Sequence, residues 1–351
     1  MKHEFSEISA TQKQLTFEIP ADTVARIEEW IAKARFKSST MVVAGMPGMG
    51  AMDDGEHVLC VDVATGKKLW SARLDDRVYE NNWGNGPRCT PTVAGQNLFA
   101  VSGNGKLACL ELNGGKVVWS VDFVKDLGGK IQNWGFTESV LVDGDRVICT
   151  PGGAKGTLAA LDRRTGKVLW RSKGVEDVAQ YSSPLVIEHG GQRQYVQLVT
   201  KRLFGVKAET GELAWQTDFP GRTAVIPTPI HAGGLVYVTA GYNAGSRQFK
   251  LGGAEPEMTY ESNKMVNHHG GVILLGKHLF GHSDQGGWTC LDLATGEVAW
   301  KNNGVGKGAI AYADGHFYCR SEGGKGTVAL IEATPTGYKE KGRFDQPDRS
   351  G

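Results

Sequence analysis

The sequence predicts an all-β protein, a β-propeller built from four-stranded antiparallel blades. Three observations lead to this prediction. One short segment recurs five times, with steps of 49, 51 and 45 residues between the first four copies and 85 residues, about two units, before the fifth. Glycine is spread evenly instead of being gathered in a linker. The 49 glycines among the 351 residues are roughly twice the usual proportion and indicate many turns.

The repeated segment is predicted to be a β-hairpin that ends in tryptophan. Apolar residues alternate into an acidic residue, a Thr-Gly pair supplies the left-handed turn position, and the alternation then resumes up to Trp. Two more β-rich runs precede each copy, so a unit of ~45 residues holds four strands, and radial stacking of such units buries both faces of each sheet. The five clear copies occupy residues 60–70, 109–119, 160–170, 205–215 and 290–300.

Seven blades can be counted between about residue 38 and residue 345, and two of their repeat copies are degenerate. The blades are predicted to end near Trp70, Trp119, Trp170, Trp215, Tyr260, Trp300 and Phe344. Residues 1–37 diverge from the repeat: 14–19 suit a strand, and 20–34 have helical spacing with a helix start signal. We expect this segment to complete or flank an eighth blade, and residues 38–351 to form the propeller.

The six cysteines are predicted to be unbridged and buried. Three of them occupy one position of the repeat, which the other clear copies fill with Ala or Gly, and this choice indicates a tight slot in the core. No Cys-x-x-Cys or Cys-x-x-Cys-His motif occurs, so neither a zinc cluster nor a covalently attached haem is supported. The three repeat cysteines are Cys60, Cys109 and Cys290, and the others are Cys89, Cys149 and Cys319.

Charge and hydropathy exclude several classes of protein. The chain has 39 Lys and Arg against 38 Asp and Glu, so it has no long-range field to attract nucleic acid or anionic lipid. No apolar stretch of ~18 residues is present to span a bilayer. The first thirty residues lack the basic and then apolar order of a secretory signal, so the chain itself does not indicate its compartment.

Candidate ligand-binding residues lie on the loops that join the outer strand of one blade to the inner strand of the next. These loops are expected to open together at the mouth of the central channel, and loops on a rigid scaffold are where binding residues concentrate. Several carry aromatic or basic side chains next to Asn or Gly. The predicted ligand-binding residues are Trp83, Arg88, Trp134, Glu138, Tyr181, His268, His269 and Lys307, with Glu322 as a further polar residue facing the channel.

Each of these residues also has a structural interpretation. Trp83 and Trp134 occupy equivalent loop positions, where a ring either stacks on a planar ligand or sugar or caps the interface between blades. Arg88 either holds a carboxylate or pairs with Glu138. The two histidines at 268–269 suggest a metal, but adjacent strand residues point to opposite faces and no other ligand stands at a suitable spacing. We therefore predict no metal site.

The repeat pattern Ala-x-Asp-x-x-Thr-Gly-x-x-x-Trp resembles that of the PQQ-like β-propeller proteins, which include quinoprotein dehydrogenases and BamB-like proteins. The resemblance runs from about residue 38 to the end and implies an eight-bladed fold and a periplasmic or secreted location. Residues 83–88, 133–139, 181–184 and 267–271 are similar to those of an uncharacterised subgroup of the family.

The resemblance implies two classes of function. A quinoprotein dehydrogenase would need Ca²⁺ held by carboxylate and Asn oxygens, a catalytic Asp, a Trp beneath the quinone and commonly a vicinal Cys pair. The sequence has no vicinal Cys pair and no recognisable calcium set, so PQQ with Ca²⁺ is kept as the alternative. We expect instead a monomeric, non-catalytic scaffold without a cofactor, which binds a protein segment, a small molecule or a saccharide at the channel face. A hydrolase or lyase at the same face is a third hypothesis.

Overall fold

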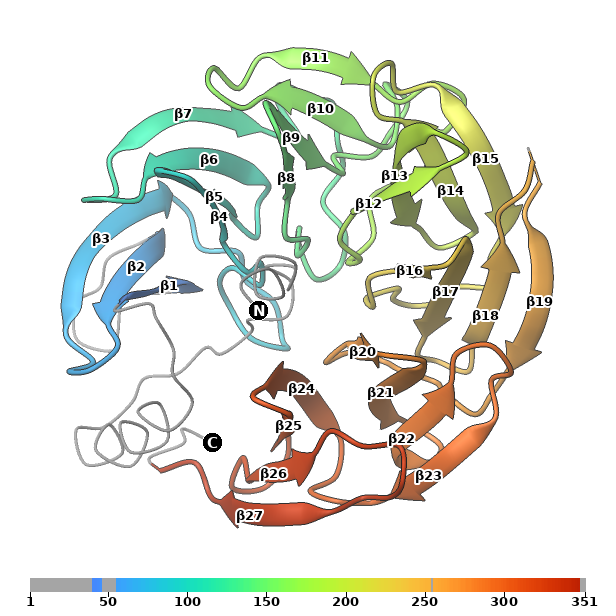
Figure 1. Ribbon diagram of the computed structural model, residues 1–351. Coiled ribbons are helices and arrows are strands. Elements are labelled where there is room, and N and C mark those ends of the chain that lie inside the picture. The colour runs from blue at the N-terminus through green and yellow to red at the C-terminus, as the bar shows by residue number, and fades with distance from the viewer. Residues whose placement is uncertain (1–39, 46–54, 254, 348–351) are drawn as a thin grey trace. The chain divides into compact units, whose positions relative to one another are not determined.

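The computed structural model describes residues 40–45, 55–253 and 255–347, and this part of the chain consists of strands and turns without a helix (Figure 1). Residues 1–37, for which the sequence suggests a strand and a helical stretch, lie outside the described residues. The chain divides into two compact units with the boundary between Ala179 and Gln180. The predicted domain boundaries at 37 and 38 stay a prediction.

Unit 1 contains three consecutive antiparallel sheets. The first has three described strands, one fewer than expected, and the other two have four strands each. The strands are β1 (Thr40–Gly45), β2 (Glu56–Asp62) and β3 (Lys68–Asp75); β4 (Thr92–Ala94), β5 (Asn97–Val101), β6 (Lys106–Glu111) and β7 (Val117–Asp122); and β8 (Leu141–Asp143), β9 (Arg146–Cys149), β10 (Ala159–Asp162) and β11 (Val168–Arg171).

Unit 2 contains four consecutive sheets, and each has four strands that pair in chain order. They are β12 (Leu185–His189), β13 (Gln192–Leu198), β14 (Arg202–Lys207) and β15 (Leu213–Asp218); β16 (Ile230–Ala232), β17 (Leu235–Ala240), β18 (Gly245–Lys250) and β19 (Glu257–Ser262); β20 (Val272–Leu275), β21 (His278–Ser283), β22 (Gly287–Asp292) and β23 (Val298–Asn302); and β24 (Gly308–Ala313), β25 (His316–Ser321), β26 (Val328–Glu332) and β27 (Glu340–Phe344). This succession of meandering sheets is the blade pattern of a β-propeller, as predicted.

The Thr-Gly turn of the repeat is held by its acidic residue. In the first sheet, Asp62 Oδ1 accepts hydrogen bonds from the backbone N and the hydroxyl of Thr65, at 2.8 and 2.7 Å. Gly66 then adopts a φ of +66° and donates its N–H to the Asp62 carbonyl. These hydrogen bonds lower the pKa of Asp62 below its ordinary value. Asp162 with Thr165 and Asp292 with Thr295 repeat the arrangement.

The predicted tight slot lies directly opposite the repeat tryptophan on the neighbouring strand. Cys60 pairs with Trp70 across β2 and β3, and Gly205 pairs with Trp215 across β14 and β15. A Cβ at Gly205 would lie only 2.5 Å from the Trp215 ring, which explains why small residues occupy this position. The register shifts directly after the slot in every sheet, so a β-bulge is part of the repeat.

The two degenerate copies form the same hairpin with a longer turn. Gln248 in the slot faces Tyr260, as the sequence predicts. In the last sheet, however, Leu330 in the slot faces Gly342. Phe344 lies two residues beyond the position that Trp occupies elsewhere, so the aromatic end predicted for this blade is replaced by glycine.

Neighbouring blades of unit 1 are joined by the repeat tryptophans. A Cβ at Gly115 would lie 2.5 Å from the Trp70 ring, and one at Gly166 would lie 2.6 Å from the Trp119 ring. Trp119 Nε1 also donates to the carbonyl of Arg163 at 2.9 Å. The repeat tryptophans therefore pack against the turn of the next blade, which leaves them unavailable as ligand-binding residues.

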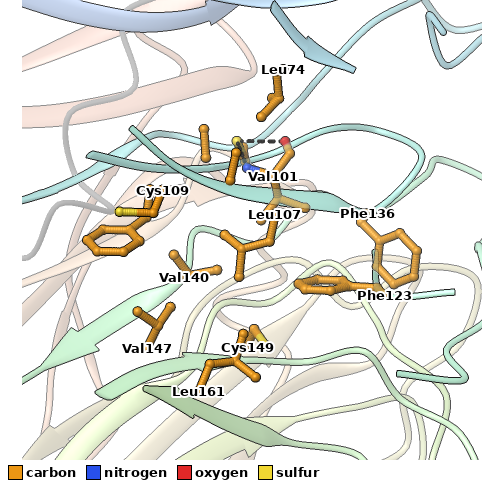
Figure 2. Close-up of a cluster of buried hydrophobic side chains, with 14 of the residues drawn as sticks. Leu74, Val101, Leu107, Cys109, Phe123, Phe136, Val140, Val147, Cys149 and Leu161 are labelled. Atoms are coloured by element: carbon orange, nitrogen blue, oxygen red, sulfur yellow. Dashed lines mark hydrogen bonds between the residues drawn. The ribbon is translucent and has the colours of Figure 1, made fainter. Parts of the chain in front are cut away.

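The core of unit 1 is built from side chains of all three of its sheets (Figure 2). Phe123 and Phe136 meet edge to face with ring centroids 5.2 Å apart, beside Leu107 (Figure 2). Cys109 and Cys149 belong to the same cluster. All six cysteines are buried and free, in agreement with the sequence prediction.

Candidate functional site

The predicted site residues fall into both units of the chain, and each group is described by itself. Four of them belong to unit 1 and four to unit 2, and the prediction that all eight meet at one channel mouth stays a prediction. The residues of unit 1 are Trp83, Arg88, Trp134 and Glu138, and those of unit 2 are Tyr181, His268, His269 and Lys307.

Arg88 closes the loop that leads from β3 to β4. Its guanidinium donates to the carbonyls of Gly84 and Gly86, and to Asn81 Oδ1 at 3.1 Å. It also reaches the carbonyl of Trp134 in the next interblade loop, at 3.3 Å. The guanidinium of Arg88 is therefore held by three backbone carbonyls and the Asn81 side chain. The carboxylate whose pKa its charge lowers is Glu56, and not the predicted partner Glu138.

Tyr79 ties the same loop to its neighbour, and the sequence analysis did not single it out. Its hydroxyl donates to the carbonyls of Gln132 and Asn133, at 3.1 and 2.9 Å. Asn81 Nδ2 donates to the Asn133 carbonyl as well, at 3.2 Å. The Arg88 guanidinium lies over the Tyr79 ring, 5.7 Å from its centroid, so the two side chains brace each other.

This braced loop presents Trp83 to solvent. The Trp83 side chain is 80% exposed, while its backbone N donates to Asn81 Oδ1 at 2.9 Å. Gly84 follows with a φ of +117°, a conformation that suits glycine. Trp134, predicted to be equivalent, is only partly exposed. The two aromatic residues therefore differ, and Trp83 is the one that projects from a fixed backbone.

Glu138 is an interior group of unit 1. It is 2% exposed and accepts a hydrogen bond from the backbone N of Thr150 at 2.6 Å, which fixes the end of β9. Burial raises its pKa to about 7. Glu56 is a second buried carboxyl group and accepts from the backbone N of Tyr79 and of Gly103, both at 2.8 Å. These two buried carboxyl groups fix the backbone of the segments at Thr150, Tyr79 and Gly103.

Tyr181 is also an interior residue, because its side chain is only 7% exposed. Its backbone N donates to the Val225 carbonyl at 3.0 Å, which joins two loops of unit 2. The prediction that its ring faces a ligand is not supported by this burial.

Unit 2 brings the other predicted residues into a compact polar cluster. Lys307 Nζ lies 2.6 Å from His268 Nδ1 and 2.9 Å from Asp284 Oδ1. An ammonium group can only donate, so His268 accepts this hydrogen bond and its imidazole is neutral when the bond is formed. Burial, with the charge of Lys307, lowers the pKa of His268 below its ordinary value.

A second pair lies beside the first. His269 Nε2 is 2.6 Å from Glu322 Oε2, and the imidazole rings of His268 and His269 are 4.9 Å apart. The backbone N of Glu322 donates to the Lys307 carbonyl at 2.8 Å. The cluster therefore joins the loops that follow β19, β21, β23 and β25, and the sequence analysis had identified its members except Asp284.

The β17–β18 turn adds an aromatic residue in a costly backbone conformation. Tyr242 and Asn243 have φ angles of +56° and +62°, in the left-handed region that non-glycine residues rarely adopt. The Tyr242 ring meets the His268 ring edge to face, with centroids 4.6 Å apart, and Asn243 Oδ1 accepts from Gln285 Nε2 at 2.8 Å. The sequence has no pattern that marks Tyr242, because residues 241–244 form a longer loop than the two-residue turns in which Asn-Gly is diagnostic.

Comparison with known proteins places the chain in a family. A family model described as outer membrane protein assembly factor BamB matches residues 54–302. The chain belongs to the BamB family. The predicted resemblance to PQQ-like propellers of the BamB type is thereby confirmed.

Relatives of the BamB family and of the quinoproteins both appear in the comparison. BamB of Bordetella pertussis is 24% identical over 269 residues, which make up 73% of this chain and 65% of that protein. The dehydrogenase subunit of the quinone alcohol dehydrogenase of Gluconacetobacter polyoxogenes is 34% identical over 150 residues, 38% of this chain and 19% of that protein. The matches thus span less than two thirds of these relatives.

The solved structure of BamB from Moraxella catarrhalis agrees with the BamB-family fold. It superposes with a TM-score of 0.61 and 16% sequence identity, covering 88% of this chain and 89% of that one. At this identity the likeness shows the fold alone.

No helix in the described ranges has the length and apolar character needed to cross a bilayer.

Because some relatives are quinone alcohol dehydrogenases, the side chains that could hold PQQ and Ca²⁺ in this chain are of interest. Among the described residues, no three or more His, Cys, Asp or Glu side chains are placed to hold a metal ion together. Burial raises the pKa of Cys89 to about 12, and all six thiols lie in the interior. That this chain takes neither PQQ nor Ca²⁺ stays a prediction.

Proposed function

We propose that this protein is a non-catalytic propeller scaffold that binds a segment of a partner protein, with Trp83 as the anchor. The observation that carries the proposal is the 80% exposure of Trp83 on a loop whose other polar groups fix its backbone. Tryptophan is among the residues that contribute most to protein interfaces. A loop already held in place loses little conformational freedom on binding, so the anchor acts at low entropic cost.

The relatives support a role in assembly and a location. The name of the Bordetella relative describes a factor for the assembly of outer membrane proteins. By analogy, the partner would be a protein segment that this chain holds during assembly, and the compartment would be the periplasm or the cell exterior.

Site-specific photocrosslinking tests the proposal. Trp83 is replaced by p-benzoylphenylalanine in cells that produce the protein, and Val118 is replaced in the same way as the control. Val118 is 47% exposed on the outer strand β7 and belongs to no loop of the candidate site. We expect position 83 to give a discrete protein adduct that position 118 does not give. Identical adducts from both positions, or none from position 83, would contradict the proposal.

A PQQ-dependent alcohol dehydrogenase is the second candidate, because the relative from Gluconacetobacter polyoxogenes is 34% identical over 150 residues. We test it by adding PQQ and Ca²⁺ to the purified chain and measuring alcohol-dependent reduction of an electron-accepting dye. We expect no reduction above the rate without protein. Turnover that depends on both additions would overturn the non-catalytic proposal.

A further inference from the structure

The outer strands of unit 1 carry large aliphatic side chains at the β-bulge of the repeat. In the second sheet, Trp119 and Val117 each have a partner on β6, while Val118 between them has none and is the extra residue of the bulge. The same position of the other two sheets also holds an aliphatic residue. The three bulge residues of unit 1 are Leu69, Val118 and Leu169, and they are 53%, 47% and 50% exposed.

The four sheets of unit 2 place small or polar residues at the same position, namely Ala214, Thr259, Ala299 and Lys341. The bulge therefore forms without a large aliphatic residue, and the hairpin itself does not require one. Exposed aliphatic side chains that the fold does not require are typical of a surface that contacts another molecule. The bulge residues thus distinguish the outer strands of unit 1 from those of unit 2.

The three bulge residues of unit 1 form a row along one edge. Figure 1 shows β3, β7 and β11 as the outermost strands of three successive sheets, in agreement with the order in which their strands pair. The turn of the second hairpin lies against Trp70 and the turn of the third lies against Trp119, so the successive hairpins are in contact. We call residues 67–69, 116–118 and 167–169 the outer edge of unit 1.

A lysine comes two residues before each bulge residue of unit 1. These lysines are Lys67, Lys116 and Lys167, which are exposed and form no ion pair among the described residues. Their backbone carbonyls accept hydrogen bonds from the acidic residues of the turns, at 2.8 or 2.9 Å, so the turn fixes the backbone of each lysine. Unit 2 has Glu212 and Glu297 at this position, and each pairs with a lysine of its own unit, at 3.2 and 2.7 Å. The outer edge of unit 1 therefore combines aliphatic side chains with positive charge that the described residues do not neutralise in an ion pair.

Protection of the sheet edge explains only part of this pattern. Lysines and bulges on outer strands hinder pairing with a strand of another molecule. This explains the bulge in both units and the lysines of unit 1, but a protected edge favours polar bulge residues such as Thr259 and Lys341 of unit 2. The aliphatic bulge residues of unit 1 have the opposite character, so they indicate contact through side chains.

The charge and the exposure of this edge favour protein over lipid as the contact. Apolar groups that anchor a protein at a membrane are buried in the boundary between headgroups and acyl chains. The bulge residues are only 47–53% exposed and lie on strands, so they present a shallow surface. Carboxylates of an acidic peptide segment can pair with the three lysines while its apolar side chains cover the bulge residues.

We infer that the outer edge of unit 1 docks an acidic segment of a partner protein that also carries apolar side chains. Aspartate or glutamate side chains of the segment pair with Lys67, Lys116 and Lys167, and its apolar side chains pack on the bulge residues. This edge does not include the Trp83 loop, so the inference goes beyond the proposed function and does not depend on it.

Peptide display tests the chemistry of the partner. A phage-displayed library of random peptides is selected on the full chain and, in parallel, on a triple variant with Leu69→Ser, Val118→Ser and Leu169→Ser, which should fold because these residues are exposed. We expect the peptides enriched by the unaltered chain alone to contain more Asp and Glu than the unselected library, together with Leu, Ile, Val or Phe. Selection of neutral or basic peptides, or no selective enrichment, would overturn the inference.

A matched pair of variants assigns the binding to this edge. Val117→Ser in unit 1 and Met258→Ser in unit 2 change apolar residues that take the same place in the register of their hairpins and are 43% and 50% exposed. We expect Val117→Ser to weaken the affinity for a selected, fluorescein-labelled peptide about tenfold in fluorescence anisotropy, because an apolar contact at the centre of the edge is lost. Met258→Ser should stay within about twofold of the unaltered chain. Equal weakening by the two changes would show that the edge is not the contact.

Charge reversal tests the lysines in the same assay. Lys116→Glu should weaken the binding of the selected peptide by about tenfold or more, because it sets a carboxylate against the acidic segment. Lys301→Glu makes the same change at an exposed lysine on β23 of unit 2 and should stay within about twofold. A Lys116→Glu variant that binds as tightly as the unaltered chain would contradict the charge complementarity on which the inference rests.

Two other occupants of the edge are outcomes that would also overturn the inference. Sedimentation with vesicles of phosphatidylglycerol and phosphatidylcholine that the triple variant loses would show that the edge binds a membrane. Self-association in analytical ultracentrifugation that the triple variant loses would show that the edge binds a second copy of the chain. None of these results concerns Trp83, and because Val118 belongs to this edge, a crosslinked adduct at position 118 should differ from the adduct at position 83.

Discussion

The interblade loops of unit 1 and unit 2 use their charged side chains in opposite ways. In unit 1, Arg88 and Glu138 bind backbone groups, so that charge fixes the loops from within. In unit 2, His268, Asp284 and Lys307 bind one another, so that their remaining donors and acceptors stay near the surface. The loops of unit 1 are therefore fixed mainly through backbone groups, and those of unit 2 are joined through side chains.

The largest expected difference is between two tryptophans of unit 1. Trp119→Ala should lower the free energy of unfolding by about 3–5 kcal/mol, because its ring packs on Phe99 with centroids 5.9 Å apart and on the turn at Gly166. Trp83→Ala should change it by less than about 0.5 kcal/mol, because that side chain is 80% exposed. Urea denaturation of both variants measures the two values. Equal losses would show that Trp83 supports the fold and is not an anchor.

The pH dependence of unit 1 should follow Glu138. Its pKa is raised from 4.5 to about 7 in the folded protein, so the folded state holds the proton more tightly than the unfolded chain. The resulting stability is fully present below about pH 4.5 and is lost as pH rises through about 7, roughly 3 kcal/mol in all. Glu138→Gln should reduce this slope in denaturation curves measured from pH 5 to pH 8, and the part that remains is expected from Glu56, whose pKa burial also raises. A slope unchanged in the variant would contradict the assignment.

The stability that depends on His268 should change with pH in the opposite direction to the stability that depends on Glu138. Burial and Lys307 lower the pKa of His268 below its ordinary value of 6.5, so the folded state resists protonation. Stability is therefore present above pH 6.5 and is lost as pH falls through the lowered pKa. His268→Asn should flatten the acid limb of the stability curve, while His316→Asn should leave it unchanged. The same acid limb in both variants would place its origin elsewhere.

The smallest expected effect lies in the repeat turns, where the two units should not differ. Thr65→Ala in unit 1 and Thr295→Ala in unit 2 each remove a hydroxyl hydrogen bond to an Asp, at 2.7 and 2.9 Å. Each also removes a weaker bond that the hydroxyl accepts from a backbone N, at 3.3 and 3.2 Å. Both turns are exposed, so each change should lower Tm by only about 1–2 °C. Thermal unfolding of the pair checks this. A large difference between the two Tm changes would mean that the repeat turns, and not only the interblade loops, differ between the two units.

The sequence was sufficient for the blade hairpins because their determinants are local. The acidic residue, Thr and Gly of each turn lie within five residues of each other, and the slot filled by Cys60 or Gly205 follows from the Trp that the hairpin places opposite it. The last blade ends at Phe344, as predicted, but Phe344 does not take the position that Trp has in the other copies. A turn lengthened by two residues moved Gly342 into the Trp position, and counting from the aromatic residue missed this change.

Residue identities alone therefore account for the strands, the hairpins, the buried cysteines and the family, but the β-bulge in each hairpin became visible only in the strand register. Only tertiary structure decided which loop side chains are available. Trp83 and Trp134 look alike in sequence, but the contacts that separate them join residues about fifty positions apart, such as Tyr79 and Asn133. Asp284 and Tyr242 likewise join the His268 cluster through contacts between residues that are distant in the sequence. The burial and the hydrogen bonds of a loop side chain depend on contacts with loops far away in the sequence. The sequence of one loop does not specify which other loop will pack against it.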